Sequence, residues 1–162
     1  MEDQASFVVR FGSLFEHSPW IAHEAWRPGG FADANAMLDS MAEVIAAADD
    51  ADQLRLLRSH PELAGQEARS GTLTPASTEE QASAGLGQLD AQEAAELHRL
   101  NAVYRDRHGF PFIICVRHYT KLGIFAELGR RAKRPTRTER EEALAQVLFI
   151  ARARLSRLLA GD

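Results

Sequence analysis

Apolar residues recur along most of the chain at a spacing of three or four residues, which places them on one face of an α-helix. Such faces run along residues 7–15, 37–45, 54–57 and 144–158, and a shorter one lies along residues 20–25. Polar residues occupy the opposite faces, as expected for helices that pack on a core. The pattern predicts an all-α protein, a bundle of roughly eight helices.

Start and stop signals mark the ends of several of these helices. Ser77–Glu80 and Thr138–Glu141 have the form of a capping box, and Asp90–Glu93 is a similar start. Ser18–Pro19 predicts another helix start, with the serine as N-cap and the proline at the first helical position. Gly109 predicts the end of the helix that begins near residue 90.

Two segments depart from the helical pattern. Residues 61–76 contain glycines and prolines among polar residues, so we expect a loop with at most one short turn. Residues 110–116 are aromatic and β-branched around a proline, which is typical of a buried strand. Because no partner strand is evident, we expect an extended apolar passage through the core. No linker or repeat interrupts residues 1–162, which are expected to form a single domain.

Composition and charge exclude several classes of protein. The chain has 162 residues and a formal net charge of −4, which argues against a general nucleic-acid binder. No apolar run approaches the ~20 residues of a membrane span, so no membrane association is expected. Cys115 is the single cysteine, so no intrachain disulfide is expected and a reducing, cytoplasmic location is predicted. Its apolar neighbours predict a buried, inert thiol.

Basic residues gather between positions 130 and 140. They include Arg130, Arg131, Lys133, Arg134, Arg137 and Arg140. We expect a solvated loop and helix start, and the alternative is a phosphate or nucleic-acid site.

The chain contains six histidines, and His60 is the most informative of them. Two histidines four residues apart around a glutamate, the spacing of a zinc protease, are absent, so no metal site is expected. Pro61 ends a helix and fixes the backbone where the His60 imidazole is displayed. An imidazole can move a proton near neutral pH. On the local sequence alone, however, the favoured interpretation is a structural histidine stabilised by the negative end of the helix.

Further polar candidates lie at the predicted helix start near residue 77 and on the last helix. Ser77 and Glu80 have capping roles, whereas Gln81 can both donate and accept hydrogen bonds. The N–H groups of a helix N-terminus also suit an anionic ligand. Arg152 and Arg154 are either solvated or form a clamp on a carboxylate or ureido carbonyl.

These segments, in this order, resemble the family of 2-oxo-4-hydroxy-4-carboxy-5-ureidoimidazoline (OHCU) decarboxylases. The resemblance spans nearly the whole chain. It is carried by residues 15–22 (FEHSPWIA), 60–65 (HPELAG), 77–81 (STEEQ), 84–86 (AGL), Asn101, Tyr104, 109–113 (GFPFI) and 150–155 (IARARL). Each motif alone is weak, but the ordered set is specific.

The resemblance implies an all-α fold, a homodimer and a reaction that uses neither a metal nor an organic cofactor. The implied substrate is the ureidoimidazoline that 5-hydroxyisourate hydrolysis releases, and the implied product is (S)-allantoin. His60 and Glu80 fall on the family's catalytic positions. The implied substrate-binding residues are Pro61, Ser77, Gln81, Phe112, Ile113, Ile114, Cys115, Val116 and Arg154. In this set the segment 112–116 contributes backbone contacts, and Arg152 is the alternative to Arg154.

One residue departs from the family pattern. His108 stands where the family often has an aromatic residue, which puts local packing in question more than activity. Two other functions fit the same residues. One is a non-catalytic helical module that binds a ureide or a partner protein, and the other is a decarboxylase of a related ureido acid.

Overall fold

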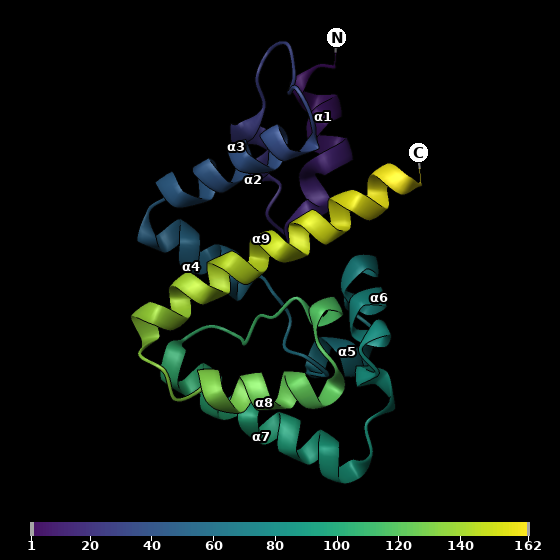
Figure 1. Cartoon of the computed structure of the whole chain (residues 1–162), viewed down its shortest axis with the longest axis vertical. Helices are drawn as coiled ribbons and strands as arrows, with labels where there is room; N and C mark the ends of the chain where they lie inside the picture. Colours follow the sequence, from purple (N-terminus) through teal and green to yellow (C-terminus); the bar gives the residue numbers. More distant parts are fainter. Residues whose placement is uncertain (1, 162) are drawn as a thin grey trace. The chain divides into compact units, whose positions relative to one another are not determined.

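The computed structural model describes residues 2–161, and within this range nine α-helices and three short 3₁₀ helices form without any strand (Figure 1). The α-helices are α1 (Gln4–Phe11), α2 (Trp20–Ala25), α3 (Ala34–Ala47), α4 (Asp50–Arg58), α5 (Gln66–Ser70), α6 (Pro75–Ser83), α7 (Ala91–His108), α8 (Lys121–Arg131) and α9 (Thr136–Ala160). The 3₁₀ helices are η1 (Gly12–Leu14), η2 (Leu86–Gln88) and η3 (Val116–His118). The predicted all-α fold is confirmed.

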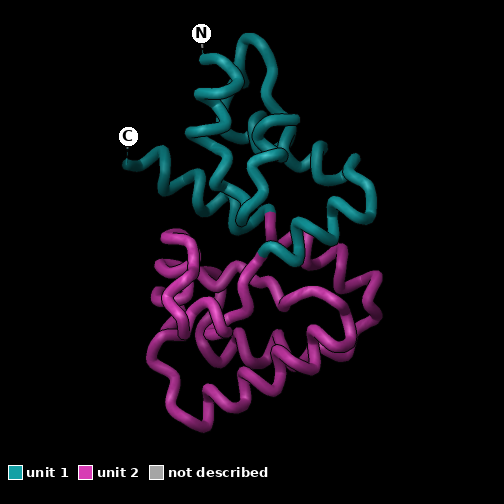
Figure 2. The backbone as a smooth tube through the Cα atoms, turned by 180° about the vertical axis from the view of Figure 1, so that it is seen from behind, with its two compact units in different colours: residues 1–59, 148–162 teal, residues 60–147 magenta. Residues whose placement is uncertain are grey.

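The chain forms two compact units (Figure 2). Unit 1 comprises residues 1–59 and 148–162, and unit 2 comprises residues 60–147. The long helix α9 contributes its first half to unit 2 and its second half to unit 1. The single domain expected for residues 1–162 stays a prediction.

Unit 1 is built around the apolar faces of its helices. Helix α2 contacts both α1 and α3. Asp33 caps α3 by accepting a hydrogen bond from the Ala36 N–H at 2.8 Å, which satisfies one of the unpaired donors at the helix start. The buried apolar side chains of this unit include Phe7, Phe11, Phe15, Ile21, Met37, Leu38, Met41, Ile45, Leu56, Leu57 and Leu155.

Unit 2 is built on α7, which packs against α8. The predicted capping box at its start is confirmed, because the Asp90 side chain accepts from the Glu93 N–H while the Glu93 side chain accepts from the Asp90 N–H. Gly109 ends the helix at φ 79°, in the left-handed region that favours glycine. The buried apolar side chains include Leu63, Leu86, Leu97, Tyr104, Ile124, Leu128 and Val147.

The segment after α7 is extended and buried, as predicted. Phe110 and residues 112–116 are all at most 5% exposed. Pro111 removes one backbone donor from this passage, and η3 begins at Val116. Since no strand pairs with the segment in residues 2–161, its backbone must find hydrogen-bond partners of another kind.

Three predicted helix starts are wrong. Helix α2 begins at Trp20, and the Ser18 hydroxyl donates to the Glu16 carbonyl oxygen and does not cap the helix. Helix α6 begins at Pro75, because the Thr74 hydroxyl accepts from the Ser77 N–H and proline suits the first helical position. Helix α9 begins at Thr136, two residues before the predicted cap at Thr138. At α6 two capping residues, Thr74 and Ser77, lie close together, and the start is decided by Thr74, whose side chain reaches a free N–H.

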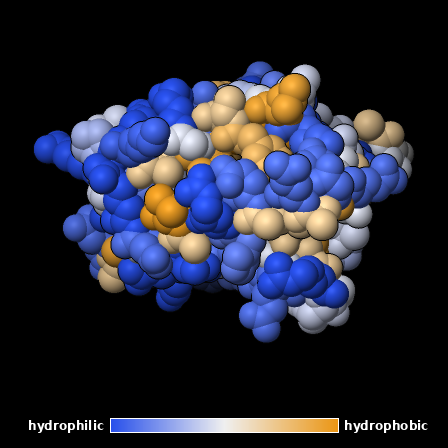
Figure 3. All heavy atoms as spheres, turned by 90° about the horizontal axis from the view of Figure 1, so that it is seen from below, coloured by the Kyte–Doolittle hydropathy of each residue, from blue (hydrophilic) through white to orange (hydrophobic). Residues whose placement is uncertain are grey.

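The face in Figure 3 is mostly hydrophilic, with apolar residues in scattered patches. Scattered exposed apolar residues are normal for a globular protein. Between residues 2 and 161, none of the helices combines the length and the apolar character needed to cross a membrane.

The left-handed conformation of Gly109 at the end of α7 leads to a prediction about stability. We expect Gly109→Ala to lower the free energy of unfolding by about 1–2 kcal/mol, because a Cβ is disfavoured at positive φ. Gly129→Ala in α8 is the matched control: a Cβ there meets no atom within 4 Å, and alanine should stabilise the helix by about 0.5–1 kcal/mol. Urea unfolding curves measure both shifts, and equal shifts of the same sign would contradict the prediction.

Candidate active site

The loop that follows His60 is fixed by side chains of two helices of unit 2. His60 is 8% exposed and directly follows Ser59, the residue that ends α4. The Gln81 Oε1 of α6 accepts a hydrogen bond from the Ala64 N–H at 2.8 Å. On α7, the Asn101 Nδ2 donates to the Leu63 carbonyl oxygen at 3.0 Å. The buried imidazole is therefore followed by a backbone whose path is held from two sides.

The same loop contains a strained residue and an ion pair. Ala64 has a φ of 47°, a value that non-glycine residues rarely adopt. The bond from its N–H to Gln81 helps to hold this conformation. Glu62 forms a salt bridge with Arg105 of α7. Strain that the surroundings hold in place is common at functional sites.

Helix α6 displays the next group of predicted site residues. Ser77, Glu80 and Gln81 are spaced i, i+3 and i+4, so they share one face of the helix. Ser77 and Gln81 are 4% and 6% exposed, and Glu80 is half-buried. Helix α6 also packs against η3, which directly follows the extended segment. The face of α6 is thus linked both to the loop after His60 and to the end of the extended segment.

Gln81 has a structural role that the sequence does not reveal. Its Oε1 accepts the hydrogen bond from the Ala64 N–H, and its Nε2 lies 3.5 Å from the Glu62 carbonyl oxygen, a long contact. The amide group has two N–H donors and two acceptor positions, so this clamp and a contact to a ligand are compatible.

The extended segment is held by two buried side chains in place of a neighbouring strand. Arg131 Nη1 of α8 donates to the Ile113 carbonyl oxygen at 2.9 Å. Gln146 Oε1 of α9 accepts from the Cys115 N–H at 2.9 Å. The Cys115 thiol forms no disulfide bond and is buried, as predicted, and its inertness stays a prediction.

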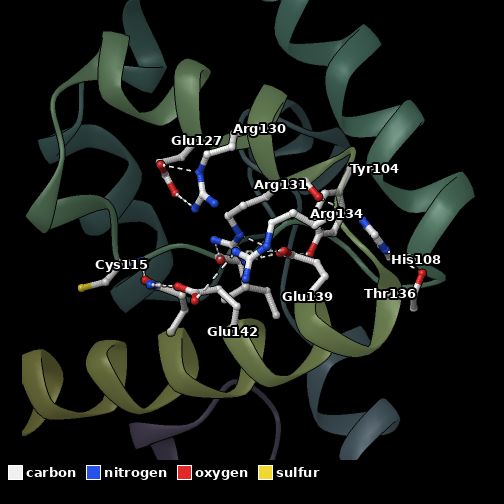
Figure 4. Close-up of polar contacts among 12 residues, drawn as sticks. Tyr104, His108, Cys115, Glu127, Arg130, Arg131, Arg134, Thr136, Glu139 and Glu142 are labelled. Atoms are coloured by element: carbon white, nitrogen blue, oxygen red, sulfur yellow. Dashed lines mark hydrogen bonds and ion pairs between the residues drawn. The ribbon is translucent and has the colours of Figure 1, made fainter.

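A buried ion pair lies beside this segment (Figure 4). Arg131 and Glu139 are both 0% exposed, and Arg131 Nε donates to Glu139 Oε1 at 2.6 Å. The Tyr104 hydroxyl donates to the same oxygen at 2.6 Å. Burial, reinforced by the Glu139 carboxylate, raises the pKa of the Tyr104 hydroxyl, so this group remains a donor. The basic run at 130–140 was expected to be solvated, and for Arg131 that expectation is wrong.

His108 belongs to the same cluster. Its Nε2 lies 3.2 Å from the Arg131 carbonyl oxygen, and its Nδ1 lies 2.9 Å from the Thr136 hydroxyl oxygen. A carbonyl oxygen only accepts, so Nε2 carries the proton and, in the neutral ring, Nδ1 accepts from Thr136. Burial lowers the pKa of His108, and the positive charges of Arg107 and Arg131 lower it further. The hydrogen bond to the Arg131 carbonyl and the charge of Glu139 raise the pKa, but burial outweighs them. The imidazole thus fits the position as a neutral, hydrogen-bonded ring stacked on Phe110.

The remaining predicted residue, Arg154, lies in unit 1. It is 9% exposed, and its Nη2 donates to Glu16 Oε1 at 2.9 Å. The Glu16 carbonyl oxygen also accepts from the Ser59 hydroxyl at 2.7 Å. Arg152 is exposed and bonds to Asn35 Oδ1. Of the two arginines, Arg154 has the buried, fixed guanidinium expected of a binding residue.

Groups of metal-ligating side chains and pockets are the other features that could form a site. In residues 2–161, no three His, Cys, Asp or Glu side chains are grouped so that they could hold a metal ion. A pocket of about 370 Å³ lies in unit 1 and is lined mainly by apolar side chains. Its lining includes Phe7, Phe11, Trp26, Phe31, Met37 and Leu155. It contains none of the predicted site residues.

Comparison with known proteins decides the family. The family model described as OHCU decarboxylase matches residues 1–156. The chain belongs to the OHCU decarboxylase family.

Individual relatives agree with this assignment. The chain is 39% identical over 153 residues to the 2-oxo-4-hydroxy-4-carboxy-5-ureidoimidazoline decarboxylase of Amia calva, covering 94% of this chain and 87% of the relative. It is 39% identical over 160 residues to a putative decarboxylase of the same name from Homo sapiens, covering 99% of this chain and 92% of the relative. The crystal structure of (S)-allantoin synthase aligns with a TM-score of 0.75 at 27% identity, covering 98% of this chain and 50% of that one.

In this member of the OHCU decarboxylase family, unit 2 brings together most of the predicted site. It contains His60, Pro61, the α6 face and residues 112–116, which are linked through Gln81 and η3. Arg154 belongs to unit 1, and its position relative to the other residues stays a prediction. The side chains that hold the loops were not among the predicted site residues; they are Asn101, Arg131, Glu139 and Gln146. Only Asn101 carried a signal, as part of the family motif.

The hydrogen bond from Asn101 to the Leu63 carbonyl oxygen leads to a prediction about the stability of this family member. We expect Asn101→Leu, which has a similar volume, to lower the free energy of unfolding by about 1–3 kcal/mol, because the Leu63 carbonyl oxygen loses its buried donor. Gln92→Leu, at an exposed position of α7, is the control and should shift stability by no more than about 0.5 kcal/mol. Urea unfolding provides the measurement, and an unchanged midpoint for Asn101→Leu would show that the bond is not needed.

The neutral state of the buried His108 ring leads to a prediction of how stability depends on pH. The folded protein keeps this imidazole neutral below its ordinary pKa of 6.5, whereas the unfolded chain takes up the proton there. The unfolded state then binds more protons, so the contribution of His108 to stability is full above about pH 7 and is lost as the pH falls below 6.5. His108→Gln, which keeps a donor for the Arg131 carbonyl, should flatten the dependence of stability on pH between 7.5 and 5.5, roughly one unit either side of an ordinary histidine pKa.

The control for this experiment is His98→Gln, because His98 is an exposed residue of the same helix. Thermal unfolding of the three proteins across the pH range gives the comparison. Parallel pH profiles for the wild type and His108→Gln would refute the assigned role.

Proposed function

We propose that this chain decarboxylates 2-oxo-4-hydroxy-4-carboxy-5-ureidoimidazoline to (S)-allantoin in urate degradation. The observation that carries the proposal is the buried His60 whose following loop is fixed by Gln81 and Asn101, in a chain that belongs to the OHCU decarboxylase family. A buried imidazole beside a fixed loop suits a proton transfer to one face of a carbon.

The chemistry requires a place for the two electrons of the breaking carbon–carbon bond. When carbon dioxide leaves, the carbon–nitrogen double bond of the substrate beside the carboxylated carbon accepts this electron pair. The protein must orient the carboxylate and stabilise the charge that develops. It must also deliver a proton to one face of the neighbouring, ureido-bearing carbon, while the hydroxyl group loses its proton and becomes the carbonyl of the product. These tasks are within the range of histidine, carboxylate and amide side chains.

His60 is the proposed proton-transfer group. It would contact the reacting carboxylate or hydroxyl group, with Pro61 beside it against the substrate. The fixed backbone of residues 62–64 limits the positions that the imidazole can adopt. A general acid or base of this kind contributes about 10²–10⁴ to the rate.

Helix α6 would bind the ureido and ring N–H groups. Glu80 is a carboxylate acceptor for such donors and also the second candidate for the proton that sets the handedness of the product. Ser77 lies in the first turn of the helix, where its hydroxyl and the neighbouring N–H groups suit an anionic oxygen. Gln81 would contact the substrate while it holds the His60 loop.

Two further elements complete the proposed site. The backbone of residues 112–116 would exchange hydrogen bonds with the substrate amide groups. Arg154 would bind a carbonyl or carboxylate oxygen of the substrate with a guanidinium already oriented by Glu16. We also propose that the enzyme is cytoplasmic and forms a homodimer, and light scattering of the purified protein would test the dimer.

Replacement of His60 tests the proposed function. Substrate is made fresh from urate, and the circular dichroism signal of (S)-allantoin is followed against the slow spontaneous reaction. We expect His60→Asn to reduce the rate by about 10²–10⁴, because the imidazole proton transfer is lost. His98→Asn, at an exposed position of α7, should keep the wild-type rate. Absence of any acceleration by the wild-type protein would refute the function, and full activity of His60→Asn would refute the role of His60.

A further inference from the structure

Two side chains from neighbouring helices hold the extended segment on either side of Ile114. Arg131 binds the Ile113 carbonyl oxygen, and Gln146 binds the Cys115 N–H, each at 2.9 Å. Both are buried, at 0% and 4% exposure. Adjacent strands usually hold extended backbone in this way, and here single side chains of α8 and α9 replace them.

The guanidinium of Arg131 is itself held in one orientation. Its Nε bonds to Glu139 Oε1, which leaves Nη1 directed at the Ile113 carbonyl oxygen. Its Cζ lies 4.5 Å from the centre of the Phe112 ring, within the range of a cation–π contact. Arg131 therefore fixes both the backbone and a side chain of the segment.

The Gln146 amide is also oriented. Its Nε2 donates to Glu142 Oε1 at 2.9 Å, one turn earlier on α9. This bond identifies the nitrogen end of the amide, so the oxygen end is the one that faces Cys115. A glutamine held at both ends fixes its partner more firmly than a single contact would.

Ile114 lies between these two fixed points. It is 3% exposed, and neither its N–H nor its C=O hydrogen-bonds to another described residue. Nearly all buried peptide groups in proteins have a partner. A ureidoimidazoline carries both amide N–H and carbonyl groups, which are complementary to one donor and one acceptor of a peptide backbone.

We propose that Arg131 and Gln146 are positioning residues that fix residues 113–115 so that the Ile114 backbone binds the ureido or ring amide group of the substrate. The inference rests on the proposed function. Neither side chain needs to touch the substrate, since each acts through the backbone that it holds. A backbone contact present both before and during the reaction affects substrate binding more than the chemical step.

Gln146→Leu tests the proposal with little change in side-chain volume. We expect KM for the ureidoimidazoline to rise about 10–100-fold, because the Cys115 N–H loses its acceptor and the Ile114 backbone moves. The value of kcat should change much less. Gln92→Leu, at an exposed position of α7, is the matched control and should leave KM and kcat unchanged.

Arg131→Lys is the second variant. Lysine keeps the positive charge beside Glu139, but it lacks the planar fork that bonds to Glu139 and Ile113 together. We expect a folded protein with a raised KM. Affinity for (S)-allantoin, measured by calorimetry, should fall in both variants by a factor similar to the rise in KM.

The outcomes separate this proposal from the function on which it depends. A wild-type protein that does not accelerate decarboxylation would overturn the proposed function and the substrate role of Ile114 with it. An active wild type combined with unchanged KM in folded Gln146→Leu and Arg131→Lys would overturn the positioning role alone. A fall in kcat at constant KM would also overturn it, because a purely structural role reduces the amount of active enzyme. A raised KM with weaker (S)-allantoin binding would support it.

Discussion

The buried ion pair between Arg131 and Glu139 is the interaction on which unit 2 depends most. It joins the end of α8 to the start of α9, and Tyr104 adds α7 through the same carboxylate oxygen. Removing either partner from such a pair costs about 3–5 kcal/mol, because the other charge stays buried without compensation. An apolar pair of the same volume could be equally stable, yet it could not donate to the Ile113 carbonyl oxygen. A charged Arg131 in the core is therefore explained both by the extended segment that it holds and by the helices that it joins.

Irregular backbone in this all-helical protein is held by side chains because no sheet is present in residues 2–161 to pair with it. Gln81 and Asn101 hold residues 63 and 64, and Arg131 and Gln146 hold residues 113 and 115. In each pair the two side chains come from different helices, so the position of a loop follows the packing of the bundle. Buried backbone groups need partners, and amide and guanidinium side chains are long and polar enough to supply them.

The sequence predicted the helices well because their apolar faces repeat over many residues, as along α3 and α9. It also predicted the extended segment, whose composition is unlike that of the helices. Helix starts were less certain, since Thr74 and Ser77 both have capping side chains and only the packed structure selects Thr74. The burial of Arg131 could not be predicted, because its partner Glu139 lies eight residues away beyond a change of direction and the local sequence is typical of a solvated basic run. The predicted site came from the ordered motifs, whereas the local sequence alone favoured a structural role for His60.

In the proposed site, peptide groups and ionisable side chains have different tasks, and these constraints explain why. Substrate groups that are amide-like can be recognised by peptide groups, which need no side-chain charge and are placed wherever the backbone is fixed. In the proposed site, ionisable side chains would then serve proton transfer, the task that a peptide group cannot perform at neutral pH. The proposal accounts for a segment of apolar side chains between two polar anchors: Phe112, Ile113 and Ile114 fill the core, and the Ile114 backbone would be available for substrate recognition. Exchanges among apolar residues in this segment should therefore matter less to binding than the polar side chains on α8 and α9 that hold it.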